Sequence, residues 1–180
     1  MIIVLNGPSS AGKSTLARAI QRRSKRTFLL VQLDRFIEML PLDRINDPQN
    51  FQLIKIADAN PAEVAIETGS NGQRLVTAMR ASIGAIAAEG FDILVDDVVF
   101  DGDIGVYRKA LPGQDVRLVG VFCDLNERER REKARGDRQI GQTRWQEGRV
   151  HQGAIYDLKV DTTTTPASDC ARTICDAFDL

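Results

Sequence analysis

The chain has 180 residues, of which 43% are hydrophobic, so residues 1–180 can form the core of a single domain. Its formal net charge of −1 gives no general attraction to nucleic acid or to a membrane surface, and we expect neither partner. The first apolar run, MIIVL, is too short for a membrane-spanning helix and lacks the basic flank of a signal peptide.

The first predicted elements are a buried strand at residues 2–6 and a helix in KSTLARAIQRRS, on either side of a loop of small residues. The loop, GPSSAGKS at residues 7–14, matches the phosphate-binding pattern G-x-x-x-x-G-K-[ST] in the strand–loop–helix context that this pattern requires. Glycine at both ends lets the backbone N–H groups turn inward around an anion. We therefore expect a nucleotide to bind Gly7, Pro8, Ser9, Ser10, Ala11, Gly12, Lys13, Ser14 and Thr15.

Two residues of this loop have predicted roles of their own. Lys13 is expected to reach the β- and γ-phosphates of ATP and to act in catalysis. Ser14 is expected to ligate Mg²⁺ through its hydroxyl group. ATP and Mg²⁺ are therefore the expected cofactors.

The second predicted strand, residues 28–33, ends at Asp34. Sites in parallel sheets lie at the carboxyl ends of strands, so Asp34 is a candidate general base that also binds the acceptor. Aspartate equally suits the N-cap of a helix in RFIEML, and that alternative stays open. An insertion at residues 43–69 follows, with two β-like runs within 50–69 that predict either a hairpin or cap that shapes the acceptor pocket, or an ordinary surface loop.

A helix at residues 71–89 and a third strand at 92–100 come next. The strand carries Asp96 and Asp97, whose side chains point to opposite faces, so only one of them can face the crevice and serve the metal. We assign Asp96 to Mg²⁺ and Asp97 to the acceptor, while the reverse assignment stays open.

A fourth strand at residues 116–124 leads into the charged segment NERERREKARGDRQIGQTR. Its opposite charges four residues apart are typical of a solvated surface helix. Arg131, Arg135 and Arg138 instead share one helix face without matching acids, which suits the binding of a triphosphate. We therefore predict that these arginines are catalytic and that residues 126–150 form a lid.

The last predicted strand, residues 156–163, is followed by a helix that begins at Thr165 and Pro166. The three cysteines have no C-x-x-C spacing, so we expect reduced thiols and a cytoplasmic protein. His151, the only histidine, has no partner that would predict a catalytic dyad, and we expect it at the surface. Five strands that alternate with helices predict an α/β fold with a parallel sheet.

The reaction class follows from the polar residues at the strand ends. The sequence has no N-K-x-D run for guanine recognition, and 180 residues hardly accommodate the coupling elements of a motor. A small-molecule kinase needs a base, a metal-binding carboxylate and cations for the transition state, and this chain offers candidates for all three. A nucleotide-binding regulatory module without catalysis is the alternative from another class.

The stretches LNGPSSAGKS, LDRFIEMLP, ILVDDV, RREKARGDR and YDLKVDTT occur in an order and spacing that resembles the chloramphenicol phosphotransferases over nearly the whole chain. The resemblance implies a three-layer P-loop fold of the nucleoside-kinase type, with strand order 2-3-1-4-5. It also implies transfer of the γ-phosphate of ATP to the primary hydroxyl of chloramphenicol, which inactivates the antibiotic. In that family, the general base falls on Asp34 and the lid arginines fall on Arg131, Arg135 and Arg138.

The predicted acceptor places a requirement on the apolar residues of the site. A nitrophenyl group needs apolar walls, and the chain has few aromatic residues to supply them; Phe36 is the main candidate, with Met39, Phe51 and Phe100. Another hydroxylated metabolite is therefore the alternative small-molecule acceptor. The sequence does not predict the oligomeric state.

Overall fold

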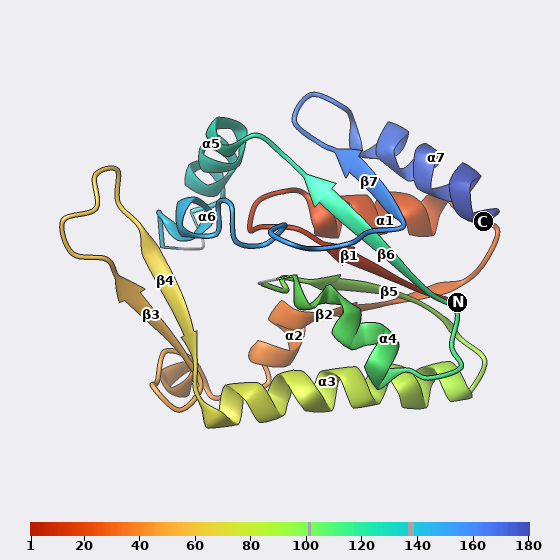
Figure 1. Cartoon of the computed structure of the whole chain (residues 1–180), viewed down its shortest axis with the longest axis horizontal. Helices are drawn as coiled ribbons and strands as arrows, with labels where there is room; N and C mark the ends of the chain where they lie inside the picture. The colour runs from red at the N-terminus through yellow and green to blue at the C-terminus, as the bar shows by residue number, and fades with distance from the viewer. Residues whose placement is uncertain (101, 137–138) are drawn as a thin grey trace.

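A five-stranded parallel sheet lies between two layers of helices (Figure 1). The structure is a computed structural model that describes residues 1–100, 102–136 and 139–180; Arg138, a predicted lid arginine, lies outside the described residues. The strand order is β2-β5-β1-β6-β7, because the strands of a separate hairpin take the numbers 3 and 4. Counted within the parallel sheet alone, the order is 2-3-1-4-5, so the predicted three-layer fold is confirmed.

The strands of the sheet are short and largely apolar. They are β1 (Ile2–Asn6), β2 (Phe28–Gln32), β5 (Asp92–Asp97), β6 (Val116–Phe122) and β7 (Leu158–Asp161). Every residue of β1 is buried, because β5 and β6 flank it and helices cover both faces of the sheet. This position explains its continuous apolar sequence, which is typical of a central parallel strand.

One face of the sheet is covered by α1 (Lys13–Arg23) and α7 (Ala167–Phe178). Their apolar side chains, such as Leu16 and Ile174, form one buried cluster with the sheet. Cys170 and Cys175 are buried in this cluster, so they pack as small apolar residues. The helix α7 starts at Ala167, because Pro166 occupies the N-cap position instead of the predicted first turn.

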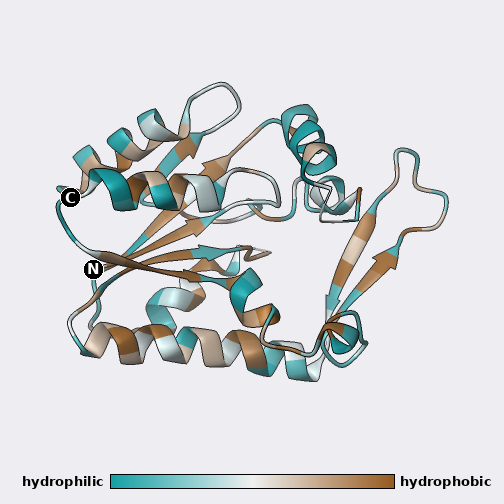
Figure 2. Ribbon diagram, turned by 180° about the vertical axis from the view of Figure 1, so that it is seen from behind, coloured by the Kyte–Doolittle hydropathy of each residue, from teal (hydrophilic) through white to brown (hydrophobic). Residues whose placement is uncertain are grey.

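The other face is covered by α3 (Ser70–Ala88), η2 (Asp103–Gly105) and α4 (Val106–Ala110). Met79 and Ile83 of α3 and Tyr107 of α4 are fully buried against the sheet. The central strands are largely hydrophobic, whereas the helices that cover them alternate hydrophobic and hydrophilic residues (Figure 2). Within the part of the chain that the structure describes, none of the helices combines the length and apolar character needed to cross a membrane.

The remaining elements gather beyond the carboxyl ends of the strands. They are α2 (Leu33–Ile37), η1 (Leu42–Arg44), β3 (Phe51–Lys55), β4 (Val64–Thr68), α5 (Leu125–Arg135) and α6 (Gln142–Trp145). Of the two alternatives for residues 50–69, the structure has the hairpin, in which β3 and β4 pair antiparallel. The hairpin contacts the α5–α6 region, since the Val64 N–H donates to the Gly141 carbonyl at 3.1 Å (Figure 1).

Candidate active site

The loop between β1 and α1 encloses a cavity of about 280 Å³ that it shares with Asp34, Asp96, Asp97 and Arg135. Two glycines have steric reasons to be there. A Cβ atom on Gly7 would lie 2.4 Å from the Val121 carbonyl oxygen, and Gly12 has a φ of 84°, where side chains are strained. The Lys13 ammonium is buried and donates to the carbonyls of Gly7 at 2.9 Å and Pro8 at 3.1 Å. The loop therefore presents a preformed cationic cradle for phosphate.

Asp96 lies directly beside this loop. Its carboxylate accepts a hydrogen bond from the Ser14 hydroxyl at 2.6 Å and one from Gln32 at 3.2 Å, and it lies 3.7 Å from the Lys13 ammonium. Carboxylate and hydroxyl oxygens are ligands that Mg²⁺ prefers, so this adjacent pair fits the magnesium site predicted from the sequence.

Asp97 points to a different environment, as the alternation of the strand requires. It is buried, and it accepts hydrogen bonds from the Tyr107 hydroxyl at 2.6 Å and the Val98 N–H at 2.7 Å. The Arg80 guanidinium lies 3.9 Å away and also stacks 5.3 Å above the Tyr107 ring. Burial raises the pKa of Asp97, although the hydrogen bond from Tyr107 opposes this shift.

A second cavity of about 380 Å³ adjoins the first. It lies between the sheet, the hairpin and α3, and its largely apolar walls include Leu33, Ile37, Phe51, Ile66, Val76 and Phe100. We call this the acceptor pocket. Phe36, predicted to line it, instead packs against the core cluster under α3, and its neighbour Ile37 faces the pocket. A single helical turn directs these adjacent side chains to different sides, and the role of Phe36 in binding the acceptor stays a prediction.

Asp34 connects the two cavities. It lies in the first turn of α2, and its side chain lines both the phosphate cavity and the acceptor pocket. The N-cap position of α2 is occupied by Gln32, so the alternative role of Asp34 as helix cap does not apply. Asp97 also lines both cavities, so Asp96 and Asp97 both reach the phosphate cavity and the expectation that only one of them faces the crevice is wrong.

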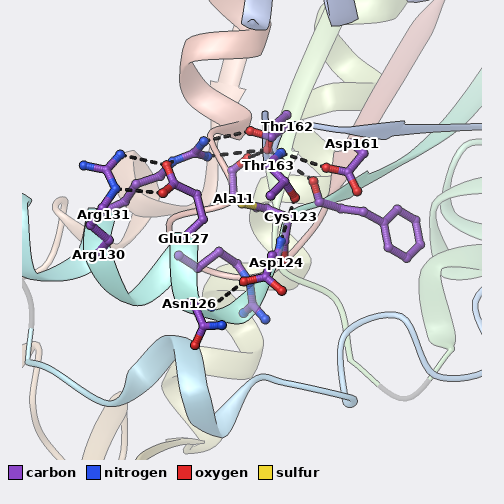
Figure 3. A network of polar contacts seen from close by, with 12 residues as sticks. Ala11, Cys123, Asp124, Asn126, Glu127, Arg130, Arg131, Asp161, Thr162 and Thr163 are labelled. Carbon is purple, nitrogen blue, oxygen red and sulfur yellow. Dashed lines mark hydrogen bonds and ion pairs between the residues drawn. The ribbon is translucent and has the colours of Figure 1, made fainter. Parts of the chain in front are cut away.

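The described lid arginines lie in different places. Arg135 lines the phosphate cavity. Arg131 does have a matching acid, contrary to the expectation, because Glu127 holds it at 2.8 Å and the Thr162 carbonyl at 2.7 Å (Figure 3). There it lines a third cavity of about 370 Å³, together with Gly12, Thr15 and residues 162–167. The hydrogen bonds from Arg130 and Arg131 lower the pKa of Glu127 to about 2.

Two charges of α5 are buried, although the four-residue spacing of opposite charges in this segment is typical of a solvated helix surface. Arg128 and Glu132 are each 1% exposed. Arg128 donates to the Cys123 carbonyl at 2.9 Å and to both oxygens of Thr143 at 3.0 Å, and it pairs with Glu147. Glu132 accepts the backbone N–H groups of Gly141 and Thr143, each at 2.9 Å.

Two side chains in and directly after α6 hold this segment against the phosphate loop. The Thr143 hydroxyl donates to the Ser9 carbonyl at 2.9 Å, and the Ser9 N–H donates to the Gln146 side-chain oxygen at 2.5 Å. Both backbone polar groups of Ser9 are thus held by side chains that follow α5 in sequence. Sequence reasoning missed Thr143 and Gln146, because no local motif marks them.

The family described as "Chloramphenicol phosphotransferase-like protein" matches residues 1–179 of this sequence. The chain belongs to this family. Two curated relatives from Mycobacterium tuberculosis, from strains CDC 1551 and H37Rv, are both named "Putative O-phosphotransferase". Each is 32% identical over 185 residues, a match that covers 98% of this chain and 81% of the relative.

Solved structures agree with the fold of this chain. They include the tunicamycin resistance protein of Deinococcus radiodurans, with 15% identity, a TM-score of 0.65 and coverage of 99% of this chain and 95% of that chain. A gluconokinase from Sinorhizobium meliloti 1021 has 15% identity, a TM-score of 0.62 and coverage of 99% and 90%. A shikimate kinase from Acinetobacter baumannii, in complex with shikimate, has 16% identity, a TM-score of 0.57 and coverage of 98% and 92%. Family and fold together support a P-loop kinase that is an O-phosphotransferase.

His151 is half-buried and not at the surface, so the prediction of a surface residue is wrong. Its ring stacks on Phe122 with centroids 3.9 Å apart, and its Nδ1 lies 2.8 Å from the Tyr156 hydroxyl. Burial lowers the pKa of His151 to about 4, with a smaller contribution from the positive charge of Arg128. The Tyr156 hydroxyl also accepts a hydrogen bond from Asn6 at 2.9 Å, so this group supports the strand that precedes the phosphate loop.

Proposed function

We propose that this protein transfers the γ-phosphoryl group of ATP to a primary hydroxyl group of a small molecule, and that chloramphenicol is the acceptor. The observation that carries the proposal is the position of Asp34, which lines a phosphate cavity on one side and a largely apolar pocket on the other. A kinase needs this adjacency, because its base must contact the acceptor hydroxyl within reach of the γ-phosphate. Inactivation of the antibiotic, in a reducing cytoplasm that suits the free cysteines, would be the result.

The donor site is built from the phosphate loop and the third cavity. Phosphates of ATP bound by the loop would leave the nucleoside beyond Thr15, where Arg131 and residues 162–167 line a cavity large enough for a base. Ser14 and Asp96 would hold Mg²⁺. When bound, this ion supplies positive charge that stabilises the phosphate oxygens.

The acceptor side supplies the proton transfer. Asp34 takes the proton of the hydroxyl group as its oxygen forms a bond to the γ-phosphorus, and the bond between that phosphorus and the bridging oxygen of ADP breaks. Lys13 and Arg135, which line the phosphate cavity, stabilise the charge that spreads over the transferred group. The products are a phosphate monoester and ADP.

The shape and lining of the acceptor pocket support chloramphenicol. Phe51, Ile66 and Phe100 give apolar walls for an aromatic ring, while Thr77 and Gln146 offer polar contacts for its amide and hydroxyl groups. The family to which the chain belongs supports the same acceptor. A different alcohol with an apolar body would satisfy the same walls.

Product analysis tests the proposal. The protein is incubated with Mg·ATP and a panel of primary alcohols that includes chloramphenicol, and the products are analysed by mass spectrometry. We expect chloramphenicol to gain one phosphoryl group, and Lys13→Ala, as the matched control, to form no product. Transfer only to another alcohol would refute chloramphenicol as the acceptor. Nucleotide binding without transfer to any alcohol would refute the kinase and favour a regulatory module.

A further inference from the structure

Gln146 takes part in both substrate sites. Its side chain is buried, with 3% of the residue exposed, yet it lines the acceptor pocket. On its other side, its Oε1 accepts the hydrogen bond from the Ser9 N–H at 2.5 Å. Ser9 in turn lines the phosphate cavity. A single side-chain amide therefore lies between the phosphate loop and the acceptor.

The contact with Ser9 fixes which end of the amide faces the pocket. An N–H group can donate only to the amide oxygen, so the Nε2 group must point the other way. Among the described residues, no hydrogen bond engages this Nε2. Nε2 is not among the fully buried unpaired nitrogen atoms of the described residues, so it is accessible, and the open side of Gln146 is the acceptor pocket. Its two N–H donors are thus available to a bound molecule.

The surroundings of Gln146 keep it in this position. The neighbouring Thr143 holds the Ser9 carbonyl, and Thr143 is itself fixed by the buried Arg128 and Glu132. The amide cannot turn toward a ligand without releasing the Ser9 N–H. A ligand bound at Nε2 therefore restrains the same amide that holds the Ser9 N–H, so the phosphate loop has less freedom to lose when the nucleotide binds.

We propose that Gln146 binds an oxygen atom of the acceptor molecule through Nε2 while Oε1 holds Ser9, and that the acceptor and the nucleotide therefore bind cooperatively. The inference rests on the proposed function, because it assumes that an alcohol occupies the acceptor pocket. It adds a chemical requirement on that alcohol. Besides the hydroxyl at Asp34 and an apolar body, the acceptor needs a second oxygen that accepts hydrogen bonds, such as a carbonyl or hydroxyl oxygen.

The test measures cooperativity as well as turnover. Isothermal titration calorimetry gives the dissociation constant of β,γ-imido-ATP with and without saturating chloramphenicol, for the wild type and for Gln146→Leu. In the wild type we expect the nucleotide to bind at least about 5-fold more tightly when the acceptor is present, at the lower end of ordinary coupling between sites. In Gln146→Leu the ratio should fall to within about 2-fold of unity, and chloramphenicol affinity should fall roughly 3- to 10-fold, the usual effect of one neutral hydrogen bond.

Gln73→Leu is the matched control. Gln73 also lines the acceptor pocket, but its side chain donates to the Thr68 carbonyl at 3.4 Å and makes no described contact with the phosphate loop. This variant can lower chloramphenicol affinity, but it should keep the wild-type cooperativity. Gln146→Glu provides a second variant if Gln146→Leu fails to fold, because it keeps an oxygen for Ser9 and removes the N–H donors. It should lose cooperativity as well.

The outcomes separate the two proposals. A Gln146 variant that weakens nucleotide binding equally with and without acceptor has lost only structural support, and that result would overturn the inference. Wild-type cooperativity in Gln146→Leu or Gln146→Glu would overturn it too. If the wild type phosphorylates a different alcohol of the panel, that alcohol replaces chloramphenicol in the titrations. Absence of any phosphorylated product would instead refute the proposed kinase.

Discussion

Glu132→Gln is expected to destabilise the protein strongly, although it changes a single atom of one side chain. The carboxylate of Glu132 is 1% exposed and accepts two backbone N–H groups, those of Gly141 and Thr143, at 2.9 Å each. A glutamine has only one oxygen. It can keep one of these hydrogen bonds, but its NH₂ group must then face the other N–H, where donor meets donor.

The size of the effect follows from these two contacts. A hydrogen bond to a charged group contributes about 1.5–3 kcal/mol, and a buried N–H left unpaired costs about 1–3 kcal/mol. Because the variant also weakens the remaining hydrogen bond, we expect a total loss of about 2–5 kcal/mol in the free energy of unfolding. For a domain of this size, that corresponds to a decrease of roughly 5–20 °C in melting temperature.

The decrease in melting temperature is measured by thermal melting of Glu132→Gln, of the wild type and of a control variant, Glu129→Gln. Glu129 pairs with Arg144 at 2.6 Å, but both side chains are more than 20% exposed, so its loss should cost about 0–1 kcal/mol. Because Thr143 holds Ser9, Glu132→Gln should also weaken nucleotide binding. Equal melting temperatures for the two variants would refute the argument that the buried carboxylate stabilises α6.

Three further variants test other parts of the site. Asp34→Asn should lower turnover by roughly 10²–10⁴-fold with an unchanged melting temperature and nucleotide affinity, and an active variant would exclude Asp34 as the base. Gly7→Ala would place a methyl group 2.4 Å from the Val121 carbonyl oxygen, so the loop must shift and calorimetry should show loss of nucleotide binding. Burial lowers the pKa of His151 from 6.5 to about 4, so the unfolded chain binds a proton between these values that the folded chain does not. The contribution of His151 to the free energy of unfolding is complete above pH 6.5 and falls as the pH drops toward 4. In urea unfolding, His151→Phe should lose this part of the pH dependence. An unchanged pH profile would contradict the lowered pKa of His151.

The sheet and the phosphate loop could be predicted because their signals are local. Buried parallel strands require continuous apolar runs, and the loop requires glycine and small residues at fixed spacing, so both can be recognised without knowing what surrounds them. The joint assignment of Ser14 and Asp96 to the metal also rested on local signals. Asp96 lies near the carboxyl end of its strand, and Ser14 lies in the first turn of the helix after the phosphate loop, where sites in parallel sheets form.

The residues that sequence reasoning misplaced depend on distant contacts. Arg128 and Glu132 are one helical turn apart, as in a solvated ion pair, but both are buried and both bind the segment at residues 141–147. His151 is half-buried, with its ring stacked on that of Phe122, almost 30 residues earlier. Local spacing carries no information about either contact.

The hairpin of β3 and β4 serves one of the two substrate sites only. It contributes Phe51, Ile66 and Thr68 to the acceptor pocket, but no described residue to the phosphate cavity or to the cavity beside Arg131. Exchange of this single insertion would therefore change which alcohol fits while the donor half of the enzyme stays as it is. One junction limits such exchange: a Cβ atom at Gly141 would lie 2.6 Å from the Ala62 carbonyl oxygen. New acceptor specificities in this framework must therefore arise with a hairpin turn that still fits against a glycine at that position.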